Sequence, residues 1–304
     1  MELGIIGLGR MGMNLALRLL GGGHRVVGYD LDTDARNAFL TAGGQTAASL
    51  PLLVDSLTGP RTFWLMLPQG DAVEASIQAL LPLLDKDDLV IDGGNSHYRD
   101  SQRRARQLGE RGIAFLDVGT SGGIWGLRDG FCLMVGGERA VFDRVVPLLQ
   151  SLAPGPERGY AYLGPSGAGH FAKMVHNGVE YALMEAYAEG FALLNAKDEF
   201  GFDLAQVADT WRFGSVVRSW LLDLAAQALT EQPELAGIAP YVEDTGEGRW
   251  AVSEAIALEV PVPAMAAALQ TRFRSRQESP FAERLLAALR RQFGGHPVRP
   301  TSMV

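Results

Sequence analysis

The sequence predicts an α/β domain with a doubly wound, mostly parallel sheet, followed by an all-α domain. Up to about residue 160, short runs rich in β-branched residues alternate with helical stretches, which is typical of βαβ units. A Pro and Gly cluster at 154–169, PGPERGYAYLGPSGAG, then indicates a linker. After it the apolar pattern is long and helical, with few strand candidates.

The strands of the first domain are predicted from six apolar runs: LGIIGL, HRVVGYD, TFWLML, DLVIDGG, IAFLDVG and FCLMVGG. We place the two domains at 1–163 and 164–304. The final residues, HPVRPTSMV, are predicted to form a loose extension of the second domain.

Length and composition describe an ordinary globular protein. The 304 residues, 47% of them hydrophobic, suffice for a sizeable core and about two domains. The net charge of −8 gives no electrostatic reason to expect nucleic acid or an anionic membrane as partner. The sequence contains neither a transmembrane stretch nor the pattern of a signal peptide, so we expect a cytoplasmic protein.

Cysteine and histidine usage argues against a metal centre. Cys132 is the only cysteine, which excludes an intrachain disulfide and a cysteine-based zinc site. Because it lies in the apolar run FCLMV, we predict that it is buried in the core. The five histidines lack the paired spacing of metal ligands, and no metal is expected.

The first predicted strand leads into a glycine-rich turn and a helix, the order found in a Rossmann-like dinucleotide site. Glycines at these spacings let the backbone approach a pyrophosphate, whose charge lies against the N–H groups of the helix start. A glycine-rich turn without ligand is the alternative. We assign to cofactor binding the whole Gly-x-Gly-x-x-Gly segment: Gly7, Leu8, Gly9, Arg10, Met11 and Gly12.

The second strand ends in Asp30, 18 residues after Gly12. A carboxylate there can accept hydrogen bonds from the adenosine ribose of NAD and would repel the 2′-phosphate of NADP. NAD is therefore the predicted cofactor. NADP remains the alternative, because Arg36 could reach over a 2′-phosphate.

Two more loops follow predicted strands and should lie at the same edge of the sheet, where open parallel sheets bind ligands. One is Leu67-Pro68-Gln69 and the other contains Asn95 within GGNS. Both are predicted to contact the cofactor, although Gly and Asn are also common in ordinary connections.

An unusual helix is predicted at AKMVHNGVEY. Lys173, His176, Asn177 and Glu180 fall at i, i+3, i+4 and i+7, so one helix face is polar where an apolar stripe is usual. We expect the apolar side of the helix to support this polar face. A solvated face without function is the alternative.

Several segments together resemble the 6-phosphogluconate dehydrogenases, which are decarboxylating enzymes of the β-hydroxyacid dehydrogenase superfamily. The segments are IDGGNSHYRD, DVGTSGGIWGLRDG, GAGHFAKMVHNGVEY, Arg218-Ser219, Gly246 to Trp250 and RRQFGGH. The resemblance covers nearly the whole chain, whose length is similar to the short form of the family.

The resemblance implies oxidative decarboxylation of 6-phospho-D-gluconate to D-ribulose 5-phosphate and CO2. Lys173 would take the proton of the C3 hydroxyl while the C3 hydride passes to the nicotinamide, and would return that proton to the enolate oxygen as CO2 leaves. Glu180 would then protonate C1 of the enediol. Each role requires a particular protonation state, with Lys173 neutral and Glu180 protonated when they act.

The resemblance also implies substrate contacts and an assembly. Arg290 and His296 would reach the active site of the other subunit of a homodimer or homotetramer. The substrate-binding positions that it assigns are Asn95, Ser121, Gly122, Gly123, His176, Asn177, Tyr181, Arg272, Arg290 and His296.

The chain departs from the long form of the family near the substrate phosphate. Thr245 and Glu247 stand where the long form has a Lys and a Thr, and Arg249 could compensate for the lost Lys contact. After the second strand, Asp30-Leu31-Asp32 replaces the long form's Asn-Arg-Thr, which again favours NAD.

Two alternatives come from related proteins. One is a β-hydroxyacid dehydrogenase of the 3-hydroxyisobutyrate or tartronate semialdehyde type, which does not decarboxylate and has no role for Glu180. The other is a catalytically silent dinucleotide-binding or chromatin-reader relative, which predicts loss of the lysine, whereas Lys173 is present.

Overall fold

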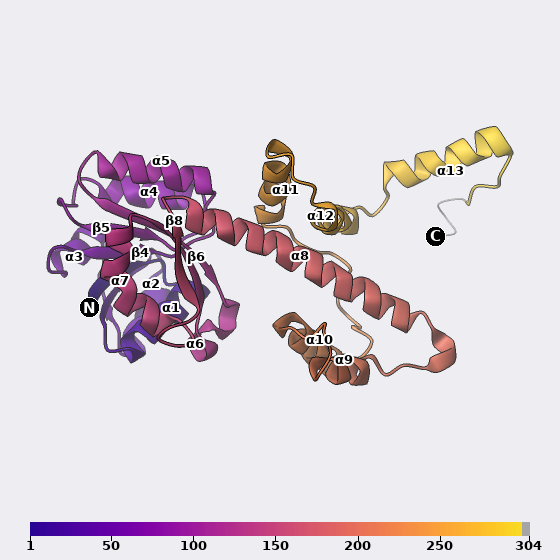
Figure 1. Cartoon of the computed structure of the whole chain (residues 1–304), viewed down its shortest axis with the longest axis horizontal. Coiled ribbons are helices and arrows are strands. Elements are labelled where there is room, and N and C mark those ends of the chain that lie inside the picture. Colours follow the sequence, from indigo (N-terminus) through magenta and orange to yellow (C-terminus); the bar gives the residue numbers. More distant parts are fainter. Residues whose placement is uncertain (300–304) are drawn as a thin grey trace. The chain divides into compact units, whose positions relative to one another are not determined.

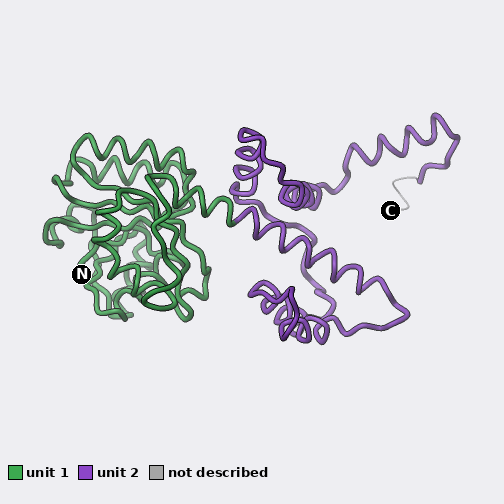
Figure 2. Tube along the Cα trace, viewed as in Figure 1, with its two compact units in different colours: residues 1–176 green, residues 177–304 purple. Residues whose placement is uncertain are grey.

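The computed structural model describes residues 1–299. The chain forms two compact units, one of residues 1–176 and one that begins at Asn177 (Figure 2). This division falls inside a single long helix, α8 (Ala168–Asn195). The domain boundary predicted after residue 163 precedes that helix.

The first unit contains a sheet with helices packed against it (Figure 1). Its eight strands have the order β3-β2-β1-β4-β5-β6-β7-β8. All neighbouring strands are parallel except β6 and β7, which are antiparallel. The predicted doubly wound, mostly parallel sheet is confirmed. Its strands are β1 (Glu2–Ile6), β2 (Arg25–Tyr29), β3 (Gln45–Thr46), β4 (Thr62–Leu65), β5 (Leu89–Asp92), β6 (Ala114–Ser121), β7 (Cys132–Gly137) and β8 (Tyr160–Gly164).

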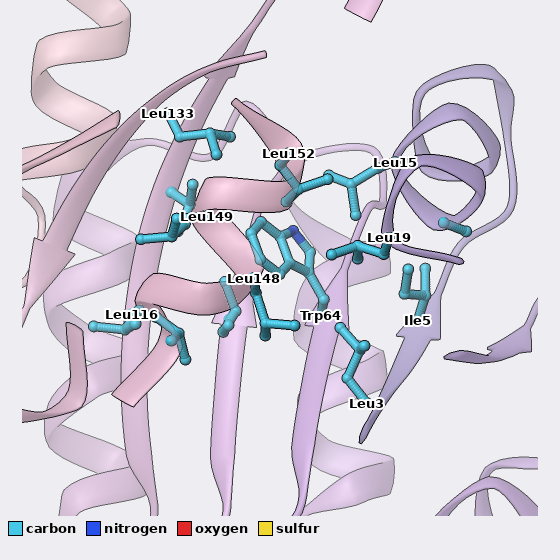
Figure 3. Close-up of a cluster of buried hydrophobic side chains, with 14 of the residues drawn as sticks. Leu3, Ile5, Leu15, Leu19, Trp64, Leu116, Leu133, Leu148, Leu149 and Leu152 are labelled. Carbon is cyan, nitrogen blue, oxygen red and sulfur yellow. The ribbon is translucent and has the colours of Figure 1, made fainter. Parts of the chain in front are cut away.

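Two apolar clusters form the core of this unit. One packs α1 and α7 against the sheet around the fully buried Trp64 (Figure 3), and the other packs α3, α4 and α5. Helices on both faces explain why the strands read as nearly continuous apolar runs. The helices are α1 (Arg10–Gly21), α2 (Thr33–Thr41), α3 (Leu50–Asp55), α4 (Asp71–Leu80), α5 (Tyr98–Gly109), η1 (Gly123–Trp125), α6 (Gly126–Asp129) and α7 (Arg139–Leu152).

The linker prediction was wrong for the stretch YAYLG, because Tyr160–Gly164 forms β8 and pairs with β7. Its alternating pattern places Tyr160 and Tyr162 on one face, where they pack against the core, and the residues between them outside. A short strand with two aromatic anchors can therefore form within a Pro and Gly rich segment.

The prediction that Cys132 is buried was also wrong. Cys132 is exposed, whereas its neighbours Phe131 and Leu133 are buried. Side chains alternate between the faces of a strand, so an apolar run at a strand end need not be buried throughout.

The second unit is helical, as predicted. Among its helices, α9 and α10 share a small apolar cluster of Ala208, Leu222, Ala226 and Leu229. Besides the continuation of α8, the elements are η2 (Asp198–Phe200), α9 (Leu204–Arg212), α10 (Trp220–Glu231), α11 (Glu247–Ala257), α12 (Pro263–Ser275) and α13 (Phe281–Gly294). Within residues 1–299 no helix combines the length and apolar character needed to cross a membrane. The predicted C-terminal extension lies partly outside the described residues.

The polar face of α8 is more buried than its apolar face. Lys173 and Asn177 are each only 8% exposed, whereas Val175 and Val179 are 37% and 43% exposed. The apolar side of this helix, which we expect to support the polar face, is therefore its more exposed side.

Candidate active site

The glycine-rich turn lies between β1 and α1, and its glycines have different reasons to be glycine. Gly7 has a φ of +98°, and a Cβ there would lie 2.4 Å from the Met66 carbonyl oxygen. A Cβ at Gly12 would lie 2.0 Å from the Gly7 carbonyl oxygen. At Gly9, by contrast, no described heavy atom beyond its chain neighbours lies within 4 Å of a Cβ position. Gly7 and Gly12 thus serve the turn itself, while Gly9 leaves room for a ligand.

A cavity of about 560 Å³ opens beside this turn. Five of the predicted cofactor residues line it: Gly7, Gly9, Asp30, Leu67 and Pro68. The remaining predicted positions are Leu8, Met11 and Gly12, which are buried or half-buried, and Arg10, Gln69 and Asn95, which are exposed. The C-terminal edge of the sheet therefore brings two predicted loops and Asp30 to one cavity.

Part of the cavity wall was not predicted from the sequence. Helix α4 contributes small residues at i, i+3, i+4 and i+7, which place one face toward the cavity. These residues are Ala72, Ala75, Ser76 and Ala79. The spacing of small residues was visible in the sequence, but such a stripe is equally typical of close helix packing.

Asp30 is held by backbone N–H groups. Its carboxylate accepts from Leu8 N–H at 2.6 Å and from Asp32 N–H at 2.9 Å, so it joins the glycine-rich turn to the end of β2. Arg36 donates to the carbonyl oxygens of Asp30 and Leu31 and to the Thr33 hydroxyl. Its guanidinium is therefore engaged with the loop that follows β2.

A buried ion pair fixes the loop that contains Asn95. Asp92 is 0% exposed and Arg104 is 1% exposed, and Arg104 Nη1 lies 3.0 Å from the Asp92 carboxylate. The same carboxylate accepts from the Ser96 hydroxyl at 2.6 Å and from Gly94 N–H at 3.2 Å. The backbone of the Asn95 loop is thus held around a buried charged pair. Sequence reasoning missed Arg104, since nothing local connects it to Asp92.

Helix α8 begins on a buried carboxylate. Asp117, which is 0% exposed, accepts from Gly167 N–H at 2.7 Å and from His170 N–H at 2.9 Å. These N–H groups belong to the first turn of the helix and its approach, where intrahelical acceptors are missing. An anion at this end also interacts favourably with the helix dipole. Asp117, on β6, therefore acts as a cap supplied from a distant part of the chain.

Glycine contacts bring the start of α8 close to the sheet. A Cβ at Gly169 would lie 2.4 Å from the carbonyl oxygens of Asp117 and Met134. A Cβ at Gly119 would lie 2.4 Å from the Lys173 Cβ. The stem of Lys173 therefore crosses β6 at a glycine, and this close approach accounts for the burial of the lysine.

Two predicted substrate residues meet beside Lys173. Ser121 Oγ lies 3.4 Å from His176 Nε2, and Ser121 pairs across the strands with Cys132. Partial burial of the sulfur raises the pKa of the Cys132 thiol, while the positive charge of Lys173 acts in the opposite direction. Ser121, His176, Lys173 and the Cys132 thiol thus form one polar neighbourhood at the ends of β6 and β7.

The loop that carries Gly122 and Gly123 depends on unusual backbone angles. Gly122 has a φ of +129° and Gly123 a φ of +53°, both in the region that favours glycine. The turn brings the chain from β6 directly into η1.

Further along α8, Tyr181 pairs with Arg272 within the second unit. The Arg272 guanidinium carbon lies 3.6 Å from the centre of the Tyr181 ring, and Nη1 donates to the Glu243 carbonyl oxygen at 2.9 Å. A Cβ at Gly248 would lie 2.6 Å from the Tyr181 ring. Two residues predicted to bind the substrate are therefore brought together, and the missing side chain of Gly248 on α11 leaves room for the Tyr181 ring.

The residues at which the chain departs from the long form make hydrogen bonds to neighbouring residues of the second unit. The Thr245 hydroxyl donates to Glu247, which is 3% exposed. Arg249 Nε donates to Asp244 at 2.5 Å, and its guanidinium lies over the Phe273 ring. Although burial opposes it, the bonds from Arg249 and from a backbone N–H lower the pKa of Asp244. Arg249 is thus paired with a carboxylate.

The remaining predicted residues lie near the end of the described chain. Arg290 is on α13 and His296 follows that helix, and both are exposed. The His296 ring packs against Phe293, with ring centres 6.2 Å apart. Asn177 is buried and Glu180 is half-buried on α8.

Comparison with known proteins decides the family. Two family models match, one described as the NAD binding domain of 6-phosphogluconate dehydrogenase over residues 2–164, the other as the C-terminal domain of that enzyme over residues 169–292. The chain belongs to the 6-phosphogluconate dehydrogenase family. A NAD(+)-dependent, decarboxylating 6-phosphogluconate dehydrogenase of Haloferax volcanii is 48% identical over 299 residues, covering 98% of each chain.

Longer members of the 6-phosphogluconate dehydrogenase family share the same two parts. A NAD(+)-dependent enzyme of Bacillus subtilis is 37% identical over 94% of this chain and 64% of its own length. The solved structure of the Plasmodium falciparum 6-phosphogluconate dehydrogenase has a TM-score of 0.84 at 28% identity, covering 99% of this chain and 67% of that one. The Mycobacterium tuberculosis 3-hydroxyisobutyrate dehydrogenase, at 22% identity and a TM-score of 0.73, shares the fold.

Proposed function

We propose that the chain catalyses the oxidative decarboxylation of 6-phosphogluconate to ribulose 5-phosphate and CO2, with NAD as the cofactor. The observation that carries the proposal is the buried Lys173, whose stem crosses Gly119 and whose helix also carries Glu180 two turns later. A lysine and a carboxyl group on one helix face, about 10 Å apart along the axis, can serve two different carbons of one sugar acid.

The cavity beside the glycine-rich turn fits a dinucleotide. NAD, when bound, supplies the hydride acceptor for C3. The open space at Gly9 suits close approach of a pyrophosphate, and the small face of α4 suits a flat base. Asp30 lines the same cavity and would accept hydrogen bonds from the ribose hydroxyls.

The residues after β2 support NAD over NADP. A 2′-phosphate would bring two negative charges beside the Asp30 carboxylate, which repels them. Arg36 could neutralise that phosphate only by giving up its bonds to the carbonyl oxygens of Asp30 and Leu31. The repulsion by Asp30 and the loss of the Arg36 hydrogen bonds both favour NAD over NADP.

Lys173 would act twice as a proton carrier. In its neutral form it accepts the C3 hydroxyl proton as the hydride leaves, and the resulting 3-keto acid has its carboxylate β to a carbonyl. Loss of CO2 then places negative charge on the C3 oxygen, and the protonated Lys173 returns the proton there. Ser121 and His176, in contact at 3.4 Å, would orient the hydroxyl groups.

Glu180 would complete the reaction as a separate acid. The enediol left after decarboxylation needs a proton on C1, and Lys173 is engaged at C3. Glu180 lies two turns further along α8 and is half-buried, so that it could deliver this proton if it is protonated at that step.

Arg272 would hold the substrate phosphate together with Tyr181. Stacking on the Tyr181 ring fixes the plane of the guanidinium, which leaves its remaining N–H groups in a defined direction. Arg249 is a weaker candidate for this role, since its guanidinium is already paired with the Asp244 carboxylate.

We infer further that the enzyme works as a homo-oligomer in which Arg290 and His296 act on a neighbouring subunit. Helix α13 supports this, because its apolar side chains are exposed in the single chain. Mixing the Lys173→Met and His296→Ala variants should restore activity. In a mixed oligomer, a site with an intact Lys173 on one subunit can receive an intact His296 from the Lys173→Met subunit. A mixture no more active than the sum of its components would contradict sharing.

The proposed function is tested with purified protein, 6-phosphogluconate and each cofactor, measuring reduced cofactor and CO2 together. We expect one CO2 for each NADH and a clear preference for NAD. Asp30→Ala should lessen that preference, while Asp34→Ala, a neighbouring exposed acid, serves as the matched control. A protein that releases no CO2, yet oxidises 3-hydroxyisobutyrate or tartronate semialdehyde with either cofactor, would overturn the proposal.

A further inference from the structure

Helix α1 carries two polar side chains that bind a distant segment of the first unit. Asn14 and Arg18 are four residues apart and therefore share a face of the helix that starts at the glycine-rich turn. Asn14 Nδ2 donates to the Ile124 carbonyl oxygen at 3.1 Å, and Arg18 Nη1 donates to the Leu127 carbonyl oxygen at 3.0 Å. Both acceptors belong to residues 122–130, between β6 and β7.

Arg18 also binds the end of α7. Its Nε donates to the Leu152 carbonyl oxygen at 2.8 Å and its Nη2 to the Ala153 carbonyl oxygen at 2.7 Å. The last carbonyl groups of a helix lack intrahelical donors and carry the negative end of the dipole, so a guanidinium is well suited to them. Phe131 N–H donates to the same Leu152 oxygen at 2.9 Å. Arg18 thus fixes residues 122–130 to the carbonyl group that also anchors their C-terminal end.

Hydrophobic packing holds only part of this segment, where Gly126 lies against the ring of the buried Phe131. The side chains of Ile124 and Leu127 are 54% and 39% exposed, and the segment begins with two glycines at positive φ. A segment whose larger apolar side chains are exposed depends more on its hydrogen bonds than a fully packed segment does. The bonds from Asn14 and Arg18 therefore matter more here than they would on a buried loop.

We propose that Asn14 and Arg18 are positioning residues, which hold the Gly122-Gly123 backbone in register with the glycine-rich turn of the cofactor site. This inference rests on the proposed function, in which Gly122 and Gly123 contact the sugar acid. Helix α1 begins at the glycine-rich turn of the cofactor site and also binds residues 122–130 through hydrogen bonds. This single helix would therefore set the distance between C3 of the sugar acid, which gives up the hydride, and the nicotinamide, which accepts it. Displacement of either by about 1 Å is enough to slow such a reaction strongly.

The proposal is tested with Asn14→Ala and Arg18→Ala, supplemented by the milder Asn14→Ser and Arg18→Lys. Loss of one hydrogen bond corresponds to roughly a tenfold change, so we expect KM for 6-phosphogluconate to rise about tenfold in Asn14→Ala and more in Arg18→Ala. The Kd for NAD, measured by fluorescence titration without substrate, should change less than about twofold. The milder variants should fall between these and the wild type.

A second readout does not need turnover. Arg128 lies within the segment with 70% of its side chain exposed, so trypsin can report how often the segment opens. Cleavage after Arg128, followed by mass spectrometry, should be about tenfold faster in Asn14→Ala. Arg111→Ala is the matched control, since Arg111 also donates to a backbone carbonyl, that of Leu81, but lies between α5 and the start of β6, at the end of that strand away from residues 122–130.

The outcomes separate the possibilities. Unchanged KM and unchanged cleavage after Arg128 would overturn the proposal, and so would an equal loss of substrate and NAD affinity with faster cleavage at all sites, which marks general destabilisation. If the wild type does not turn over 6-phosphogluconate, the proposed function fails. The tryptic comparison then still decides whether Asn14 and Arg18 hold the segment.

Discussion

The buried carboxylate of Asp117 offers a sharp test of how the start of α8 is held. Both of its oxygens accept from backbone N–H groups, from Gly167 at 2.7 Å and from His170 at 2.9 Å. In Asp117→Asn one oxygen is replaced by an NH2 group of almost the same size. Whichever way the amide is turned, one backbone N–H then faces another donor in a buried place.

The expected cost follows from two terms. A hydrogen bond to a charged acceptor contributes about 1.5–3 kcal/mol, and an unsatisfied buried donor costs about 1–3 kcal/mol. Some relaxation of the helix start will reduce their sum, so we expect the free energy of unfolding to fall by about 3 kcal/mol. Activity should fall as well, because Lys173 lies one turn after His170 on the same helix.

Urea unfolding followed by far-ultraviolet circular dichroism measures this effect. The matched control is Asp203→Asn, at the exposed N-cap of α9, where the carboxylate accepts from Gln206 N–H at 3.1 Å. Asn is about as good an N-cap as Asp, so the control should lose less than about 0.5 kcal/mol. Equal losses in the two variants, or a loss below about 0.5 kcal/mol in Asp117→Asn, would refute the reasoning.

Three further predictions concern single side chains. Lys173→Met keeps the bulk but removes the amine, and should lower kcat by at least about 10³-fold while NAD still binds; turnover within tenfold of the wild type would exclude the base role. Glu180→Gln should slow ribulose 5-phosphate formation more than NADH formation in a rapid-quench experiment, and equal slowing would point to another acid. The hydrogen bond from Arg103 lowers the pKa of Glu74 from 4.5 to about 2, so its contribution to stability is complete above pH 4.5 and is lost as the pH falls toward 2. Between pH 6 and pH 3, Glu74→Gln should therefore lose about 1 kcal/mol less stability than the wild type, after allowance for solvent screening; identical losses in urea unfolding would contradict this.

The sequence predictions succeeded where a feature depends on residues close together in the chain. The glycine-rich turn could be recognised because Gly7, Gly9 and Gly12 act within one turn of chain, and their spacing alone prescribes the backbone path. Asp30 could be placed because strand ends in a parallel sheet share an edge. The strand β8 was missed because Pro and Gly around it outweighed the two tyrosines that anchor it.

Other features needed the assembled structure. The pairing of Asp92 with Arg104 depends on where α5 packs against β5, and the sequence contains no local mark of it. The same is true of Asp117 at the start of α8, which is 50 residues away from Gly167 along the chain. Carboxylates on strands can serve many partners, and only packing selects one.

The sequence by itself determined the doubly wound sheet, the helical second part, the glycine-rich turn and the order of polar residues along α8. Those features follow from local periodicity and from spacing within one element. Only the tertiary structure decided that Lys173, on the polar face of α8, is buried, since this depends on Gly119 and Gly169 letting the start of the helix approach the sheet closely. Likewise, the hydrogen bonds from Asn14 and Arg18 to residues 122–130 join groups about 110 residues apart in the chain. Contacts between residues so far apart are set by tertiary packing rather than by sequence pattern.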